Sequence, residues 1–198
     1  MDYRFIKGTS PRLLVFFHGT GGNKESLLFL HQQLDPEASV LSLDGSWGQG
    51  RERRFFASLI VGQLDLVDFE KRLSAFLDFW QDLDFQPYQQ ITFVGFSNGA
   101  NFIMGLLAEG IEVVHQALLL HPSALSYSLP IISSQLPILV TAGRNDEMID
   151  LEELENLCPT WKQHAFENLT LRQFNGGHFL TESEKEVLIQ WYRDEKIT

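Results

Sequence analysis

Residues 91–100 of the chain read ITFVGFSNGA, which is its strongest structural signal. The first four residues form a short apolar run, which indicates a strand buried on both faces of a parallel sheet. The next five fit the pattern G-x-S-x-G around Ser97, and an apolar helical pattern continues to Ala108. So abrupt a reversal from strand to helix strains the serine, and the flanking glycines keep side chains out of the neighbouring strand and helix. The stretch therefore predicts a sharp turn that presents the Ser97 hydroxyl at the carboxyl edge of a sheet, as a catalytic nucleophile.

Apolar runs and helical patterns alternate on both sides of this turn. Further strands are expected at residues 12–17, 40–43, 117–120 and 138–141, with an alternating, edge-like strand at 169–174. Helices are expected at residues 25–34, 64–85, 98–108, 151–157 and 181–192. Such alternation predicts the α/β class, with a mostly parallel sheet covered by helices on both faces. We expect one domain over residues 1–198 and leave the glycine-rich segment 44–64 unassigned.

Charge and cysteine content restrict the function. The formal net charge of -11 disfavours binding to nucleic acid or to an anionic membrane surface. No apolar run approaches the ~20 residues that span a bilayer, so we expect no membrane insertion. The N-terminus lacks a basic stretch followed by an apolar core, so no signal peptide is expected. The single cysteine, Cys158, cannot form an internal disulfide, which suits a cytoplasmic protein, and we interpret it as structural.

A serine hydroxyl needs a base, and the base needs a carboxylate to orient it. His178 follows the last expected strand and two glycines, so its loop can fold back towards Ser97. Asp146 comes soon after the strand at residues 138–141, and the order Ser97, Asp146, His178 is that of α/β-hydrolases. Glu147 and Asp150 lie close enough in sequence to be alternative orienting acids.

Two backbone amides should stabilise the oxyanion that forms when a serine attacks a carbonyl. The residue after the nucleophile, Asn98, is one expected donor. The loop after the first long strand reads HGTGG over residues 18–22, and Thr20 is the other expected donor. We interpret His18 as structural, with hydrogen bonds inside this loop.

Five further residues are candidates for substrate binding. Gly19 and Gly21 let the backbone approach a substrate closely. Arg54 could bind an anionic group or form a surface ion pair, and Phe55 could line a pocket or belong to the core. His121 ends a strand at the carboxyl edge, where it could line the pocket or be a structural histidine with satisfied hydrogen bonds.

No metal or cofactor is expected. The chain has no cysteine pair and no H-x-x-x-H pattern of zinc ligands. It also lacks a G-x-G-x-x-G or Walker loop for nucleotides.

Four motifs together resemble the carboxylesterase/phospholipase group of α/β-hydrolases, from about residue 10 to the C-terminus. They are HGTGG (18–22), GFSNGA (95–100), GRND (143–146) and GGH (176–178). The resemblance is strongest to small bacterial carboxylesterases, some of them linked to quinone and hydroquinone stress. It implies an α/β-hydrolase fold with little or no lid and a triad of Ser97, Asp146 and His178. It also implies hydrolysis of small to medium carboxylic esters without a cofactor, and a homodimer, since relatives often form one.

Other functions remain open on the same fold. A thioesterase or lysophospholipase would use the same triad, and a non-catalytic small-molecule-binding protein could keep the fold without activity. A covalent serine probe separates the last reading from the others. An enzyme like dienelactone hydrolase is expected to carry cysteine at the turn, where this chain has Ser97.

Overall fold

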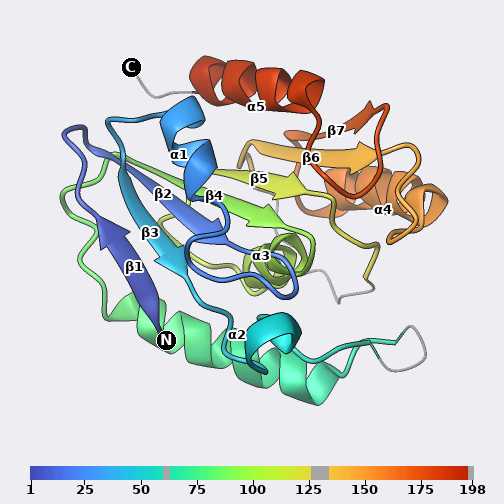
Figure 1. Ribbon diagram of the computed structural model, residues 1–198, viewed down its shortest axis with the longest axis horizontal. Helices are drawn as coiled ribbons and strands as arrows, with labels where there is room; N and C mark the ends of the chain where they lie inside the picture. Colours follow the sequence, from blue (N-terminus) through green and yellow to red (C-terminus); the bar gives the residue numbers. More distant parts are fainter. Residues whose placement is uncertain (60–62, 126–133, 196–198) are drawn as a thin grey trace.

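The computed structural model describes residues 1–59, 63–125 and 134–195, whose strands form one seven-stranded sheet in the order β1-β3-β2-β4-β5-β6-β7 (Figure 1). The strands are β1 (Tyr3–Ile6), β2 (Arg12–Phe17), β3 (Ser39–Leu43), β4 (Gln90–Phe96), β5 (Gln116–Leu120), β6 (Ile138–Gly143) and β7 (Leu169–Phe174). Of the described strand pairs, β1 and β3 run antiparallel and the others are parallel. The predicted α/β class is confirmed, and β7 lies at a sheet edge as expected.

Helices cover both faces of the sheet. The helices are α1 (Leu28–Leu34), α2 (Leu66–Gln81), α3 (Asn98–Ala108), α4 (Leu151–His164) and α5 (Glu182–Asp194), with a short 3-10 helix at Gly50–Glu52. Apolar residues of α2, α3 and α4 pack into the core on one face, and those of α1 and α5 pack on the other. Figure 1 shows α1 and α5 together above the sheet. No helix among the described residues is long and apolar enough to cross a membrane.

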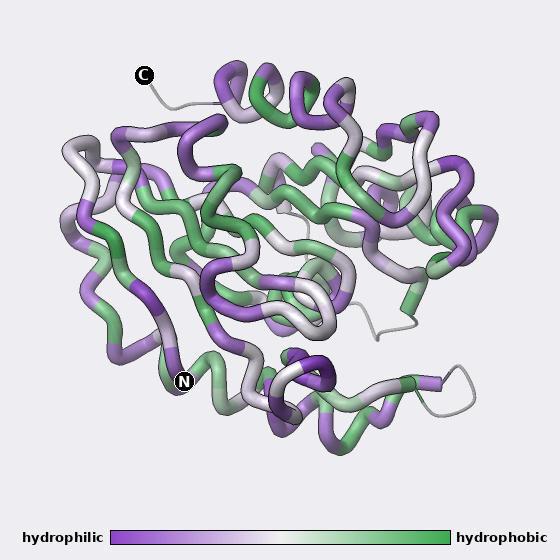
Figure 2. The backbone as a smooth tube through the Cα atoms, in the orientation of Figure 1, coloured by the Kyte–Doolittle hydropathy of each residue, from purple (hydrophilic) through white to green (hydrophobic). Residues whose placement is uncertain are grey.

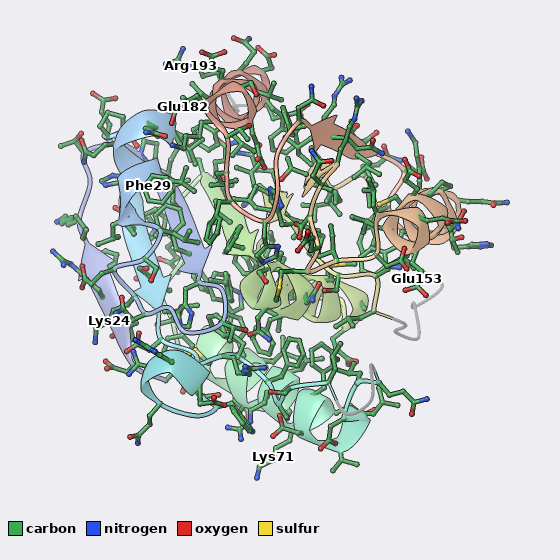
Figure 3. All side chains as sticks on the ribbon, turned by 45° about the vertical axis from the view of Figure 1, so that its right-hand side comes forward. Lys24, Phe29, Lys71, Glu153, Glu182 and Arg193 are labelled. Carbon is green, nitrogen blue, oxygen red and sulfur yellow. The ribbon has the colours of Figure 1, made fainter. Side chains whose placement is uncertain are left out.

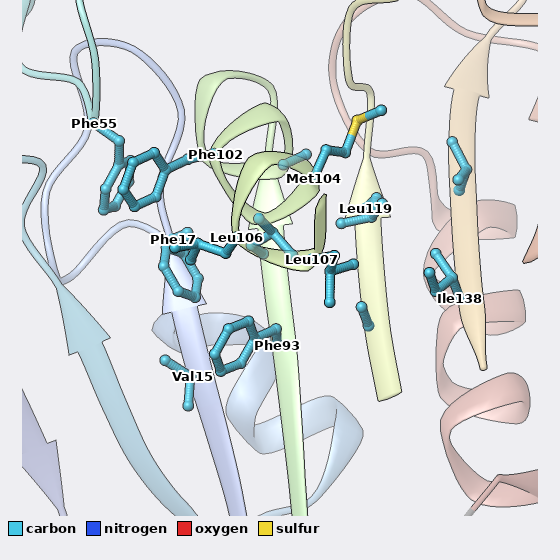
Figure 4. Close-up of a cluster of buried hydrophobic side chains, with 14 of the residues drawn as sticks. Val15, Phe17, Phe55, Phe93, Phe102, Met104, Leu106, Leu107, Leu119 and Ile138 are labelled. Carbon is cyan, nitrogen blue, oxygen red and sulfur yellow. The ribbon is translucent and has the colours of Figure 1, made fainter. Parts of the chain in front are cut away.

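The alternation of side chains along β2 explains why both faces of the sheet are apolar. Val15 and Phe17 point into one core, whereas Leu14 and Phe16 point into the other. Figure 2 accordingly shows the central strands as mainly hydrophobic. In Figure 4, Phe17 lies among aromatic residues, and its ring centroid is 5.1 Å from that of Phe93.

Side-chain caps begin helices α2, α4 and α5, whereas α1 and α3 have no side-chain cap hydrogen bond. In α5, Thr181 and Glu184 form a capping box, in which each side chain accepts a hydrogen bond from the backbone of the other residue. Asp65 caps α2, and Asp150 caps α4 by accepting from the amide of Glu153. The outer helical surfaces carry charged side chains such as Lys71 and Glu153, which Figure 3 shows projecting outwards.

The structure differs from the sequence predictions at several points. The helices predicted over residues 25–34 and 64–85 are shorter, at Leu28–Leu34 and Leu66–Gln81. Strand β1 was not predicted. The helix predicted over residues 151–157 extends to His164 and contains Pro159, because Trp161 buries its side chain in the core. The unassigned segment 44–64 contains the 3-10 turn and a bridge between Trp47 and Arg54. The stretch 122–135, on which the absence of a lid depends, lies mostly outside the described residues.

Candidate active site

The turn between β4 and α3 holds Ser97 in a strained conformation, with φ 52° and ψ −114°. A Cβ atom on Gly95 would lie 2.7 Å from the Ala100 nitrogen, and one on Gly99 would lie 2.1 Å from the Phe17 carbonyl oxygen. Real side chains do not tolerate such distances, so only glycine fits at positions 95 and 99. The turn therefore has the sterically forced geometry that the motif predicts.

Two loops that are distant in sequence carry His178 and Asp146 to this turn. A Cβ atom on Gly143 would lie 2.2 Å from the Gly177 carbonyl oxygen, so glycine lets the loop after β6 touch the loop after β7. The Asn145 amide donates to the Gly176 carbonyl oxygen at 2.9 Å and joins the two loops. Both loops follow parallel neighbouring strands, which places their side chains at the same sheet edge.

The structure brings together the three residues that the sequence singled out. His178 Nε2 lies 3.0 Å from Ser97 Oγ, and His178 Nδ1 lies 2.8 Å from Asp146 Oδ2. The two alternative acids lie elsewhere: Asp150 caps α4, and Glu147 is exposed. Asp146 is therefore the carboxylate in position to orient His178.

The Asp146 carboxylate is buried and densely hydrogen-bonded. Burial by itself would raise its pKa, but hydrogen bonds from His121, His178 and the Met148 amide outweigh that effect and lower it. The side chain is thus held as an anion, which is the form that can stabilise a histidine imidazolium.

Of the expected oxyanion donors, Thr20 lies in the loop after β2 and Asn98 is the first residue of α3. Among the described residues, neither backbone amide donates to a protein acceptor, so both are free to bind an oxyanion. The Asn98 side chain accepts a hydrogen bond from the Phe55 amide at 2.7 Å. His18 Nδ1 lies 2.7 Å from the Gly19 carbonyl oxygen, and His18 Nε2 accepts from the Gly45 amide at 2.9 Å. His18 is thus a structural residue of its loop, as expected.

Two cavities meet at Thr20. The larger, of about 340 Å³, is mainly apolar and has Lys185 at its wall. Its other lining residues are Gly19, Gly22, Ser26, Leu27, Phe29, Phe96, Phe179 and Leu180. The smaller, of about 180 Å³, contains Ser97, and its wall includes Arg54, Asn101 and Met148. Gly19 and Arg54 therefore lie where a substrate-binding role requires.

Three of the candidate substrate-binding residues line neither cavity, and for Phe55 and His121 the structure favours the core and structural alternatives that the sequence left open. Phe55 is fully buried, and its ring stacks on Phe102 in the core (Figure 4). Gly21 faces the backbone of Arg51. His121 is only 1% exposed and lies behind Asp146, where its two ring nitrogens face carboxylates.

Sequence reasoning did not identify the aromatic residues of the larger cavity. Phe96 and Phe179 adjoin Ser97 and His178 in sequence, and that adjacency was the available signal. Phe179 is 80% exposed, which is unusual for a phenylalanine and marks the rim of the site.

The ligand atoms of His121, Asp146 and His178 lie within 4.8 Å of one another, which could suit a metal ion. However, both histidines direct Nδ1 at the same Asp146 oxygen, at 2.9 and 2.8 Å. These are distances of N–H donors to a carboxylate, whereas a metal would need both nitrogens deprotonated and about 2.0 Å from the ion. We therefore interpret the cluster as a hydrogen-bonded network.

The sheet order, the strained turn and the serine, histidine and carboxylate at the carboxyl edge define an α/β-hydrolase. Residues 57–192 match the model of the dienelactone hydrolase family, and the chain belongs to that family. It is 33% identical to the putative hydrolase MhqD of Bacillus subtilis over 98% of each chain. This agrees with the resemblance found from the motifs.

Solved structures share the fold. The carboxylesterase of Bacillus cereus is 32% identical, with a TM-score of 0.87, and the match covers 99% of this chain and 95% of that one. The carboxylesterase of Mesorhizobium loti is 23% identical, also with a TM-score of 0.87, over 96% of this chain and 93% of that one. The second likeness concerns the fold alone.

Proposed function

We propose that the protein is a serine carboxylesterase for small to medium carboxylic esters. The observation that carries the proposal is the continuous contact from Ser97 through His178 to Asp146, with distances of 3.0 and 2.8 Å. The 32% identity to a carboxylesterase of Bacillus cereus supports the same reaction. The serine, rather than cysteine, at the turn favours ester hydrolysis over dienelactone chemistry.

In the proposed reaction, Ser97 Oγ attacks the ester carbonyl carbon while His178 Nε2 takes the hydroxyl proton. The amides of Thr20 and Asn98 bind the oxyanion of the tetrahedral intermediate. The intermediate collapses to an acyl-serine, and His178 returns the proton to the departing alcohol. Water then attacks the acyl group with His178 as base, which releases the acid and restores Ser97.

The two cavities on either side of Thr20 offer separate space for the acyl and alcohol parts of an ester. The larger one is walled by Leu27, Phe29 and Phe179, so it suits an apolar group of medium length. The smaller one contains Ser97 together with polar groups such as Arg54 and Asn101, so it suits a short or polar group.

The test is hydrolysis of p-nitrophenyl esters from acetate to laurate by the wild type and by Ser97→Ala. We expect the variant to lose activity by a factor on the order of 10⁴ or more. Ser74→Ala, on the exposed side of α2, is the matched control and should retain full activity. A second series, with acetate joined to longer alcohols, identifies which part of the ester occupies the larger cavity.

A non-catalytic binding protein is the competing function. A fluorophosphonate probe should label Ser97 in the wild type, and His178→Ala should abolish the labelling. Equal hydrolysis by wild type and Ser97→Ala, or a wild-type serine that the probe does not label, would refute the proposal.

A further inference from the structure

His121 lies directly after β5 and is held rigidly behind the catalytic residues. Its φ is 51°, a conformation that residues other than glycine seldom adopt, and its backbone amide donates to the Thr141 carbonyl oxygen at 2.9 Å. The side chain is 1% exposed, so it does not reach substrate. Strained and buried polar residues of this kind persist where the surroundings impose them, often at functional sites.

The ring of His121 joins two buried carboxylates. Its Nδ1 lies 2.9 Å from Asp146 Oδ2, and its Nε2 lies 3.2 Å from Glu184 Oε2. The same Asp146 oxygen faces Nδ1 of His178 at 2.8 Å. A continuous chain of contacts therefore runs from Glu184 through His121, Asp146 and His178 to Ser97, and its first two members have no part in the proposed reaction.

The proton count indicates that His121 is charged. Ionised carboxylate oxygens only accept hydrogen bonds, so each ring nitrogen that faces one must carry a proton. Burial lowers the pKa of His121, but the hydrogen bonds to Glu184 and Asp146 outweigh it, and the pKa is raised. Glu184 is fully buried, and a buried ionised carboxylate needs a paired positive charge, which His121 Nε2 can supply at 3.2 Å.

We propose that His121 is a positioning residue of the hydrolytic site: as an imidazolium held between Asp146 and Glu184, it fixes the Asp146 carboxylate and disfavours a positive charge on His178. This inference rests on the proposed function, because it assigns His121 a role in setting the strength of the catalytic base. Nothing in the position of His121 brings it into contact with the reacting atoms.

The two imidazole rings are close enough for their charges to interact. Their centroids are 5.7 Å apart, and the rings meet edge to face. The titratable groups around them are Asp146 in the loop after β6, Glu184 on α5, and the two histidines themselves. A positive charge on His121 at that distance opposes a second positive charge on His178.

The first test measures the ring protons of the wild type by nitrogen-15 NMR of the histidines. His121 should carry protons on both nitrogens at pH 7, because its pKa is raised. The His121→Asn variant assigns the signals. A His121 that is singly protonated at pH 7 would overturn the proposal, whether or not the protein hydrolyses esters.

The second test separates charge from position. Asparagine tolerates positive φ and can place its amide near the position of Nδ1, so His121→Asn can keep the hydrogen bond to Asp146 while it removes the charge. The double variant His121→Asn/Glu184→Gln also removes the carboxylate that would otherwise be buried without a partner, and glutamine still suits the capping box of α5. Glu186→Gln, an exposed change of equal charge on α5, is the control.

The measured quantity is the rate of Ser97 labelling by a fluorophosphonate as a function of pH, which requires no knowledge of the substrate. We expect the acid limb of the profile to move up by about one to two pH units in both His121 variants, with most of the plateau rate retained. The control should follow the wild type. A folded variant with an unmoved limb, or with no labelling at any pH, would overturn the proposal.

If wild-type Ser97 does not label at all, the proposed function fails, and the NMR measurement of the His121 ring protons still decides this inference.

Discussion

Replacing Ser97 by glycine is expected to leave the protein more stable than replacing it by alanine, although under the proposed mechanism both changes abolish hydrolysis. The serine has φ 52° and ψ −114°, where a Cβ atom is strained. Its amide donates to Leu120 at 2.8 Å and its carbonyl oxygen accepts from Asn101 at 3.0 Å, so the turn cannot relax. Such strain is about 1–3 kcal/mol, and the extra freedom of unfolded glycine offsets about 0.4–1 kcal/mol of it. The free energy of unfolding of Ser97→Gly should therefore exceed that of Ser97→Ala by about 1 kcal/mol.

Urea unfolding measures this difference. Both variants lose the contact between Ser97 Oγ and His178, so the comparison isolates the backbone. A difference of 1 kcal/mol corresponds to about 2–4 °C in Tm for a chain of this size. Ser74, exposed within α2, is the matched control, because there glycine should be less stable than alanine by about 1 kcal/mol. If glycine at position 97 is no more stable than alanine, the turn is not strained and the reasoning fails.

Three further outcomes follow from buried groups. Asn98→Ala should lower the free energy of unfolding in urea by about 1–3 kcal/mol, because the Phe55 amide loses its acceptor; an unchanged value would contradict this. Burial raises the pKa of Cys158 to about 12, so a thiol reagent at pH 8 should react only as the protein unfolds, and rapid labelling of the native state would refute this. Burial lowers the pKa of His18 from 6.5, so below pH 6.5 the unfolded state binds more protons than the folded state. The free energy of unfolding therefore decreases as the pH is lowered. His18→Gln should lose that contribution between pH 7 and 5, and equal Tm slopes for the two proteins would contradict it.

The central strands and most helices were predictable because their signals are local. An apolar run such as residues 91–94 can be buried on both faces only inside a parallel sheet, so its sequence already implies its surroundings. Strand β1 carries no such signal, since three of its four residues are exposed and it is ordered by pairing with β3. The extension of α4 beyond Pro159 was also invisible locally, because burial of Trp161 overrides the usual end of a helix at proline.

Within the site, the sequence by itself determined the turn around Ser97 and the chain order of Ser97, Asp146 and His178. Those features depend on glycines and strand ends within a few residues, and such short-range geometry can be inferred from residue type. Only the tertiary structure decided that Asp146, rather than Glu147 or Asp150, faces His178.

The contact between His121 and Glu184 joins residues 63 positions apart, so no local pattern predicts it. The sequence around Glu184 indicates only a helix start, because Glu184 comes three residues after Thr181. Whether a polar side chain ends in a cavity or behind a catalytic carboxylate depends on the packing of separate elements. Local sequence specifies the elements, but the position of one element's side chains against another is fixed only when the whole core forms.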